Sequence, residues 1–451
     1  MTVGSGGRIL VRASTFAGNY SITGKTLSAG STVDYAASGD QTVLETLTYS
    51  TLRVSGSGVK TLAGTLPALV SSAATSGNLE VAAGTLNLSS FTVNRGATVA
   101  GGTVSVAAGA SLKIGGTGSF PANYATHTLL SASTVEYNGG IQAVTVESYG
   151  NLILSSSTAS AYKTMPGSTM TVAGNLSSAT NAPGASIGFT NGAAVTVNGS
   201  VILGAGTTNS GGSFAYSIGG NWTNNGTFIG ASSALTLSGA NAFLTGSGST
   251  IFNDLTLANS GITADANTSL TVAGNLATSG LGTFTHPTGG SGTVTMSGTS
   301  KSISGTGIMV SKLTISGSTT TTASFTVADY LTVNGSLSAS AGTITLSGTS
   351  KTISGAGNIS FNALTVSGSI TTTSSFSLLS DFNVTGSFTA SAGTATFAGT
   401  TTFSGTASLF STTITGTLLR MGAGSTLRLT GTATLPAAKF DATTQLPNTM
   451  I

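Results

Sequence analysis

The chain repeats itself with a period of about 50 residues. Segment 292–305, Gly-Thr-Val-Thr-Met-Ser-Gly-Thr-Ser-Lys-Ser-Ile-Ser-Gly, returns almost unchanged at 342–355, and shorter matches link 313–318 to 364–369. A fixed period of this length is typical of stacked units, each of which contacts mainly its neighbours. Stacking constrains the fold more than the length of 451 residues, which would otherwise suggest two or three globular domains.

Within the repeats, apolar and polar residues alternate, as in Thr-Val-Ser-Val at 103–106 and Ser-Leu-Lys-Ile at 111–114. This alternation indicates short β-strands separated by turns. Helical spacing is missing, and Gly, Thr, Ser and Val disfavour a helix. We therefore expect an all-β fold, an elongated parallel β-solenoid of roughly 17–20 residues per coil. Each long repeat would hold about three coils, and the chain about 25.

Three regions are predicted along the chain. Residues 1–30 form an N-terminal end segment, 31–413 a continuous solenoid, and 414–451 a C-terminal end segment that carries Pro436 and Pro447. The solenoid also contains a longer repeat of about 100 residues, because 31–35 matches 133–137 and 49–54 matches 149–154. We expect the end segments to cap the solenoid, dock to another subunit, or join further sequence.

Charge is scarce: 6% of residues are charged, against about 25% in a typical domain. Disorder does not explain this composition, because 39% of residues are hydrophobic and they alternate regularly. The net charge of +3 comes from scattered residues without a Lys/Arg cluster, which argues against nucleic-acid binding. The uncharged stretch 164–253 offers little repulsion to oppose self-association.

Cysteine is absent, which excludes disulfides, thiol catalysis and Cys-based metal sites. The first ten residues lack the apolar core of a signal peptide, so we expect a mature product, a segment of a larger protein, or export by another route. No run of about 18 apolar residues occurs, and we expect no membrane-spanning helix.

Several motifs resemble the repeats of very large secreted bacterial surface proteins. They are Gly-Asn-Trp-Thr-Asn-Asn-Gly-Thr-Phe at 220–228, Phe-Asn-Asp-Leu-Thr-Leu at 252–257 and Ser-Thr-Val-Glu-Tyr-Asn-Gly at 133–139. The chain is similar in this respect to filamentous haemagglutinin and autotransporter passengers over roughly 31–399. The resemblance implies a right-handed β-helix used for adhesion or cell-surface structure. The chain departs from it in lacking a recognisable secretion signal, outer-membrane barrel or sorting region.

Each candidate site residue also has a purely structural interpretation. Lys301 and Lys351 occupy equivalent Thr-Ser-Lys turns; they could form a row that binds anionic glycans, but solvated turn residues that discourage edge pairing are the favoured interpretation. His127 and His286 have no acidic neighbour in sequence, so neither is predicted to bind a metal or to act in acid–base chemistry. Gly-Gly-Thr-Gly at 115–118 lacks the Asp of calcium-binding repeats. We predict no metal site and no cofactor.

An enzymatic function has to be considered, because polysaccharide lyases and phage tailspikes share the β-helix. Glycoside cleavage requires paired carboxylates, whereas several acids here recur at repeat positions: Asp34 with Glu136, Glu45 with Glu147, and Asp329 with Asp381. Repeated acids are more typical of a scaffold. The other acids are Asp40, Glu80, Asp254, Asp265 and Asp441. We predict no catalytic residues.

Paired threonines at 293/295, 343/345 and 394/396 resemble ice-binding ranks, but they occur once per long repeat, and ordinary β-propensity is the favoured explanation. Asparagines that recur in turns are interpreted as structural: Asn175, Asn198, Asn221 and Asn334. Trp222, the single indole, is predicted to be a packing anchor and not a carbohydrate platform.

These observations favour a structural extracellular protein that builds or decorates a bacterial surface fibre, sheath or filament. Self-association, head-to-tail or lateral, would be its mechanism. Open strand edges on different copies can pair, and a head-to-tail arrangement of copies does not close into a ring but extends into a filament. One alternative is an adhesin stalk that recognises a cell-surface glycan. Another is a phage tail fibre, which would explain the missing signal peptide.

Overall fold

The computed structural model describes residues 1–157, 160–180, 184–436, 439–441 and 449–451. It is nearly all β, with 49% strand and 1% helix, and its parallel strands form a β-solenoid of about 20 turns of about 21 residues. The predicted fold class is confirmed, with slightly longer and fewer coils than expected. Pro447, assigned to the predicted C-terminal segment, lies outside the described residues. The chain divides into two compact units, Met1–Ile229 and Gly230–Ile451.

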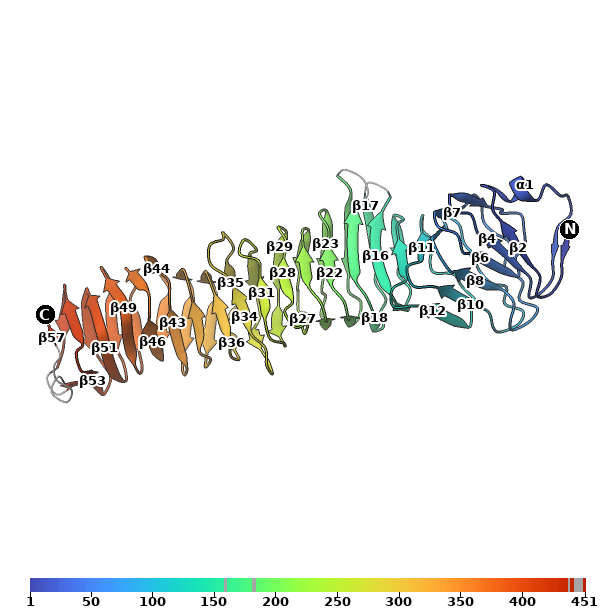
Figure 1. Cartoon of the computed structure of the whole chain (residues 1–451). Helices are drawn as coiled ribbons and strands as arrows, with labels where there is room; N and C mark the ends of the chain where they lie inside the picture. The colour runs from blue at the N-terminus through green and yellow to red at the C-terminus, as the bar shows by residue number, and fades with distance from the viewer. Residues whose placement is uncertain (158–159, 181–183, 437–438, 442–448) are drawn as a thin grey trace. The chain divides into compact units, whose positions relative to one another are not determined.

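Unit 1 contains four parallel ladders of strands (Figure 1). Ladder A consists of β2 (Arg8–Val11), β4 (Thr32–Tyr35), β6 (Thr51–Val54), β8 (Asn78–Val81), β10 (Thr103–Val106) and β12 (Thr126–Leu129). Ladder B consists of β5 (Gln41–Val43), β7 (Val59–Leu62), β9 (Thr85–Asn87), β11 (Ser111–Ile114), β13 (Thr134–Tyr137), β16 (Asn151–Ser156), β19 (Leu176–Thr180), β22 (Val201–Leu203) and β25 (Trp222–Asn224).

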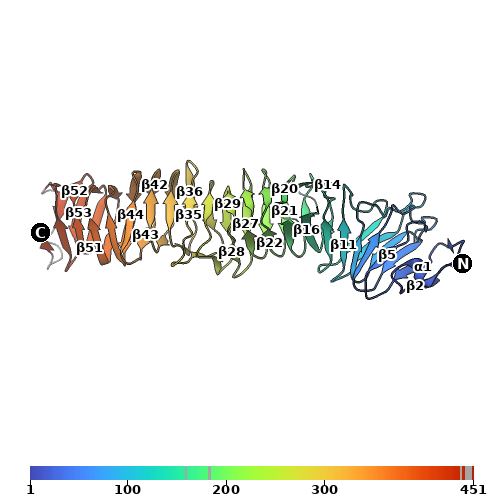
Figure 2. The ribbon, with the colours of Figure 1, turned by 90° about the horizontal axis from the view of Figure 1, so that it is seen from above.

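Ladders C and D begin later in unit 1, so that the coils gain strands along the chain. Ladder C consists of β14 (Ile141–Ala143), β17 (Ser160–Thr164), β20 (Ser186–Thr190), β23 (Thr207–Ser210) and β26 (Thr227–Ile229). Ladder D consists of β15 (Ser148–Tyr149), β18 (Met170–Val172), β21 (Val195–Val197) and β24 (Tyr216–Ile218). A separate pair joins β1 (Thr2–Val3) to β3 (Thr26–Leu27). The short helix α1 (Phe16–Asn19) lies at the end of unit 1 that carries the amino terminus (Figures 1 and 2).

Unit 2 has three ladders, and the chain visits E, F and G in that order in every coil. Ladder E consists of β27 (Ala234–Leu237), β30 (Asp254–Leu257), β33 (Leu276–Thr278), β36 (Lys301–Ser304), β39 (Ser318–Thr321), β42 (Ser336–Ala339), β45 (Asn358–Phe361), β48 (Phe376–Leu378), β50 (Thr394–Phe397), β52 (Ser411–Ile414) and β55 (Ala433–Thr434). Ladder F consists of β28 (Phe243–Thr245), β31 (Ile262–Ala264), β34 (Phe284–His286), β37 (Ile308–Val310), β40 (Phe325–Val327), β43 (Thr343–Leu346), β46 (Ala363–Val366), β49 (Phe382–Ala390), β51 (Thr400–Leu409), β53 (Leu418–Met421) and β56 (Phe440–Asp441).

Ladder G shares two long strands with ladder F. It consists of β29 (Ser249–Phe252), β32 (Leu270–Val272), β35 (Val294–Met296), β38 (Leu313–Ile315), β41 (Leu331–Val333), β44 (Lys351–Ser354), β47 (Ser369–Thr372), the second halves of β49 and β51, β54 (Thr426–Leu429) and β57 (Thr449–Met450). Parallel pairing extends into both segments predicted as ends, because β2 pairs with β4 and β53 with β56.

The alternation of apolar and polar residues in the sequence places them in separate columns of stacked side chains, the apolar ones inward and the polar ones outward. In ladder G, Val294, Leu313 and Leu331 are partners in register, and each is about 1% exposed. The residues between them in the strands, Thr295 and Thr314, form an outward column beside the buried one. Apolar side chains one coil apart thus stack on one another, since parallel strands lie about 4.8 Å apart, and each inward column excludes water along its length.

The long repeat does not coincide with a whole number of coils. Its equivalent strands β35, β43 and β50 lie on ladders G, F and E, respectively. From β35 to β43 the chain advances by eight strands, which is two coils of three strands plus two strands more. The predicted three coils per repeat is therefore wrong, because corner loops lengthen the coil. The Thr pairs at 293/295, 343/345 and 394/396 consequently fall on three different faces and form no common rank.

Unit 1 contains a buried tyrosine pair in two copies, which correspond to the repeat of about 100 residues. The Tyr35 and Tyr49 hydroxyls lie 2.8 Å apart; Tyr35 accepts the Leu44 N–H, and Tyr49 donates to the Leu44 carbonyl, both at 2.8 Å. The second copy makes the same contacts with Tyr137, Tyr149 and Thr145. Burial raises the pKa of Tyr35 to about 12. Each tyrosine pair thus satisfies the hydrogen bonding of one backbone N–H and one backbone C=O, those of Leu44 or Thr145, which lie outside the strands.

A buried glutamine marks the start of a new ladder in each copy. Gln41 begins β5, the first strand of ladder B, and its amide donates to the carbonyls of Val11 and Ala13 at 2.9 and 2.7 Å. Gln142, in the first strand of ladder C, donates to the carbonyls of Ile114 and Gly118. The side chain supplies hydrogen bonds at a face where the preceding coil has no strand, because buried carbonyls need donors.

Each glutamine lies in register with a buried lysine, Lys60 or Lys163. Both lysines are fully buried, and backbone carbonyls solvate their ammonium groups. Lys163 donates to the Gly139 carbonyl at 2.7 Å and to the Gln142 side-chain oxygen at 2.6 Å. Burial lowers the pKa of Lys60, and it lowers that of Lys163 to about 8. Sequence analysis did not anticipate these interior cations.

We expect Lys163 to add stability to unit 1 between about pH 8 and pH 9.5. In the folded protein Lys163 loses its proton near pH 8, whereas in the unfolded chain its pKa is the usual 10.5, so the folded state binds fewer protons and stability rises with pH. The gain should be about 1–2 kcal/mol, below the full linkage value because backbone groups solvate the amine. Urea unfolding at a series of pH values measures it.

Lys163→Met serves as the comparison for this pH series. It should flatten most of the rise, and Lys60 should account for the remainder. Equal slopes in the variant and the parent would contradict the assignment. The series must stop at about pH 9.5, because burial raises the pKa of six tyrosines of unit 1, Tyr35 among them. Above about pH 9 these tyrosines make the folded state bind more protons than the unfolded chain, which lowers stability.

Candidate functional site

A notch lies at a corner of unit 2 where the chain passes from ladder F to ladder G. It encloses about 560 Å³ and is lined by residues of four successive corners. The corners 311–312 and 328–330 have two and three residues, whereas 287–293 and 347–350 have seven and four. Short corners are thus recessed between longer ones, which form the walls of the notch.

Charged and aromatic side chains gather in this notch. The Lys351 ammonium lies 2.7 Å from a carboxylate oxygen of Asp329 and 5.0 Å from the ring centroid of Tyr330. Asp329 is 8% exposed, and its hydrogen bond raises the pKa of Lys351. The Lys312 ammonium donates to the Gly290 carbonyl at 2.6 Å. Two cations and one carboxylate leave the notch with a net positive charge.

The row of Lys301 and Lys351, weighed above as the alternative to solvated turn residues, does not form, and both lysines lie in strands. Lys301 lies in β36 on ladder E and Lys351 in β44 on ladder G, because the long repeat shifts each copy to another face. Lys351 instead shares the notch with Lys312, Asp329 and Tyr330, which sequence analysis did not bring together. Lys312, Asp329 and Lys351 are separated in sequence by about one coil each. This spacing predicts that they lie close together only if the coil length at this corner is already known.

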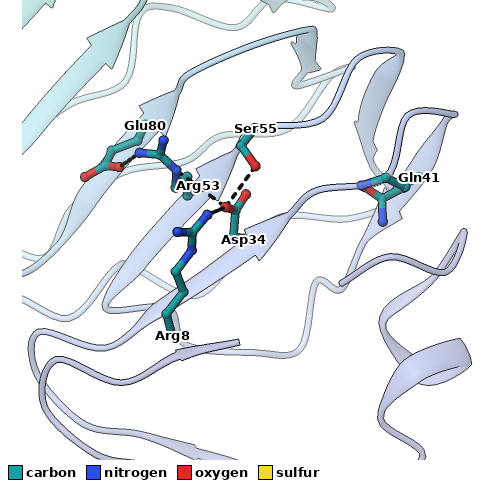
Figure 3. A network of polar contacts seen from close by, with 7 residues as sticks. Arg8, Asp34, Gln41, Arg53, Ser55 and Glu80 are labelled. Carbon is teal, nitrogen blue, oxygen red and sulfur yellow. Dashed lines mark hydrogen bonds and ion pairs between the residues drawn. The ribbon is translucent and has the colours of Figure 1, made fainter. Parts of the chain in front are cut away.

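Four acids of unit 1 lie in ion pairs between coils, and Figure 3 shows two of them, Asp34 and Glu80. Asp34 is fully buried, and one of its carboxylate oxygens contacts Arg8, accepts a hydrogen bond from Ser55 at 2.9 Å and lies 3.4 Å from Arg53. Arg53 also bonds Glu80 at 2.6 Å. Asp34, Arg53 and Glu80 are partners in register in ladder A. Opposite charges therefore alternate along an outward column, which stabilises cross-strand pairs.

Two acids of the second repeat copy, Glu136 and Glu147, are also paired. Glu136 pairs with Lys113 at 3.0 Å, and Glu147 lies 2.8 Å from the His127 ring nitrogen. The partner of His127 thus comes from 20 residues away, a distance at which a sequence motif is not recognisable. Within the described residues, no group of three or more His, Asp or Glu side chains is placed to hold a metal ion. In these pairs each carboxylate faces a cation or an imidazole, an arrangement suited to holding coils together.

The remaining candidates are interior residues. His286 is fully buried, with its Nε2 3.0 Å from the Thr268 carbonyl. Trp222 is also fully buried, and its ring packs against those of Phe228 and Tyr216, with centroids 4.7 and 6.1 Å away. As predicted, Trp222 is a packing anchor, and a carbohydrate platform would require an exposed face.

Comparisons with known proteins found no match to this chain: no family profile matches it, and no curated protein or solved structure is significantly similar. Within the described ranges, none of the helical structure has the length and apolar character required to cross a bilayer.

Proposed function

We propose that this chain is a structural extracellular protein that builds a bacterial surface fibre, sheath or filament by stacking its coils on those of a second copy. The extracellular bacterial setting rests on the resemblance of segments such as 220–228 to secreted surface repeats. A role without catalysis agrees with the ion pairs between coils that five of the acids make: Asp34, Glu80, Glu136, Glu147 and Asp329.

The first strand of ladder A carries this proposal. Among the described strands, β2 pairs with β4 alone, and its other edge is only partly occupied, by a hydrogen bond from the Tyr20 hydroxyl to the Leu10 carbonyl at 3.0 Å. Ile9, at the inward position of β2, is half-buried, whereas its column partners Val33, Leu52 and Leu79 have no exposed surface. The column therefore ends in a half-buried apolar side chain and a partly open strand edge. Another coil of the same kind would satisfy both.

Contact of this kind joins different surfaces on the two copies. A head-to-tail interface does not close on itself, and repetition produces a filament. The scarcity of charge in segment 164–253 also lowers the repulsion between neighbouring copies. Filament formation would then depend on the backbone edge and on the apolar column more than on ionic strength.

We expect the purified chain to form linear polymers that grow with protein concentration, observed by electron microscopy and sedimentation velocity. Ile9→Lys should reduce polymers to single particles, because a charge would be buried at the joint. Ile141→Lys, at an outward side chain that is 71% exposed, is the control and should leave polymers intact. Single particles at every concentration, or a loss of polymers with Ile141→Lys alone, would contradict head-to-tail assembly.

A further inference from the structure

We propose that the notch between ladders F and G binds a saccharide that carries a carboxylate or sulfate group. Its volume of about 560 Å³ lies within the range of small-ligand sites, about 300–1,000 Å³. The proposal goes beyond self-assembly and does not depend on it, because the notch lies in unit 2 and the open edge of β2 lies in unit 1.

The anionic group follows from the charge balance of the notch. Lys351 has a carboxylate partner in Asp329 at 2.7 Å, so that pair is close to neutral. Lys312 has an ion pair with none of the described acids, and its recorded acceptor is a neutral carbonyl, that of Gly290. An ammonium group has three donors, so Lys312 retains a full charge and donors for a ligand. A carboxylate or sulfate oxygen is the partner that such a group binds most strongly.

The saccharide follows from the rest of the lining. Tyr330 is 37% exposed, so part of its ring and its hydroxyl are available to a ligand that is apolar on one face and hydroxylated at its edge. Lys351 on that ring, 5.0 Å from its centroid, and Asp329 beside it hold Tyr330 in a fixed setting. The exposed Thr288 and Thr349 add hydroxyls on the two walls. A sugar ring with hydroxyls and one acidic substituent matches this set.

The test measures binding of the full chain to three oligosaccharides by calorimetry: hyaluronan fragments for carboxylates, heparin fragments for sulfates, and dextran fragments without charge. We expect one or both acidic saccharides to bind, with affinity that falls as salt is raised, and dextran to bind at least tenfold more weakly. Comparable binding of dextran, or no binding of either acidic saccharide, would overturn the proposal. Equally tight binding of poly-glutamate would favour an acidic peptide and overturn the saccharide assignment.

Two variants and a matched control locate the site. Lys312→Gln should weaken acidic saccharides about tenfold or more, as expected for loss of a hydrogen bond to a charged group, and Lys312→Arg should restore most of the affinity. Tyr330→Ala should also weaken binding. Lys301→Gln removes the same charge from the equivalent repeat position, in β36 of ladder E, and should have less than a twofold effect. An equal loss with Lys301→Gln would indicate non-specific attraction and overturn the proposed site.

Discussion

Replacing Trp222 by alanine is expected to destabilise unit 1 by about 3–5 kcal/mol, the range for deleting a large aromatic side chain from a core. Trp222 is fully buried in β25, stacked in register on Val201 of the preceding coil. Its ring meets Phe228 and Tyr216 edge to face, a geometry that adds to the effect of burial. Three aromatic rings fill the coil here, and alanine would leave a cavity that rigid strands on either side cannot close.

Thermal or urea unfolding followed by far-UV circular dichroism measures this loss, since Trp222 is the only tryptophan and its fluorescence disappears in the variant. For a unit of this size we expect the midpoint of unfolding to fall by roughly 10 °C. Trp222→Phe should lose well under half as much, because it retains a ring in contact with Phe228. Ile202→Ala, at a side chain 38% exposed in the neighbouring strand β22, is the control. Equal losses for Trp222→Ala and Ile202→Ala would contradict the packing role.

Gly335→Ala is expected to destabilise unit 2 by about 3 kcal/mol, at the upper end of the cost of overpacking. Gly335 lies at the corner between β41 and β42, directly over Gly317 of the preceding coil. A Cβ at Gly335 would lie 1.8 Å from the Gly317 carbonyl oxygen. That carbonyl accepts the Ser336 N–H at 2.9 Å and cannot move away without losing this bond. The coils would have to separate locally.

The same steric limit explains why a glycine recurs at this corner, preceded by Ser316, Asn334 or Ala356. A Cβ at Gly317 would lie 2.0 Å from the Gly298 oxygen, and one at Gly357 2.1 Å from the Gly335 oxygen. Space, and not backbone conformation, sets this requirement, because the φ angle of Gly335 is not positive. Hydrogen exchange should show lost protection in β38 and β41 of the variant. Gly167→Ala, where a Cβ would meet nothing within 4 Å, is the control, and a similar effect there would contradict the steric argument.

Some of the site's chemistry was within reach of the sequence and some was not. Lys351 was recognised as a candidate from its repeated turn, but its expected neighbour was Lys301. The neighbours found, Lys312 and Asp329, depend on corner lengths that vary from coil to coil. Coils differ by ten residues between extremes, with Ser360 paired to Ser377 and Arg53 to Glu80. A variation of this size prevents any fixed spacing in sequence from predicting which side chains share a corner.

The interior cations were beyond sequence reasoning for a related reason. From the sequence, Lys60 and Lys163 are indistinguishable from other polar residues in short strands. Their burial follows from their register with Gln41 and Gln142. A glutamine that substitutes for a missing strand is identified only when the start of a ladder is known. Backbone carbonyls that solvate the lysines belong to turns, such as the one at Gly139, and turns carry little side-chain signal.

The amino-acid sequence alone determined that this chain is a stack of short parallel strands, since alternation and repetition leave no other way to bury its apolar residues. It also determined that Trp222 packs inside. The tertiary structure decided which repeated residues share a face. The long repeat advances by two coils and two strands, so equivalent residues such as Lys301 and Lys351 separate, while unrelated ones such as Lys312 and Asp329 meet. Coil length is set by how corners pack against one another, and that is a property of the assembled stack.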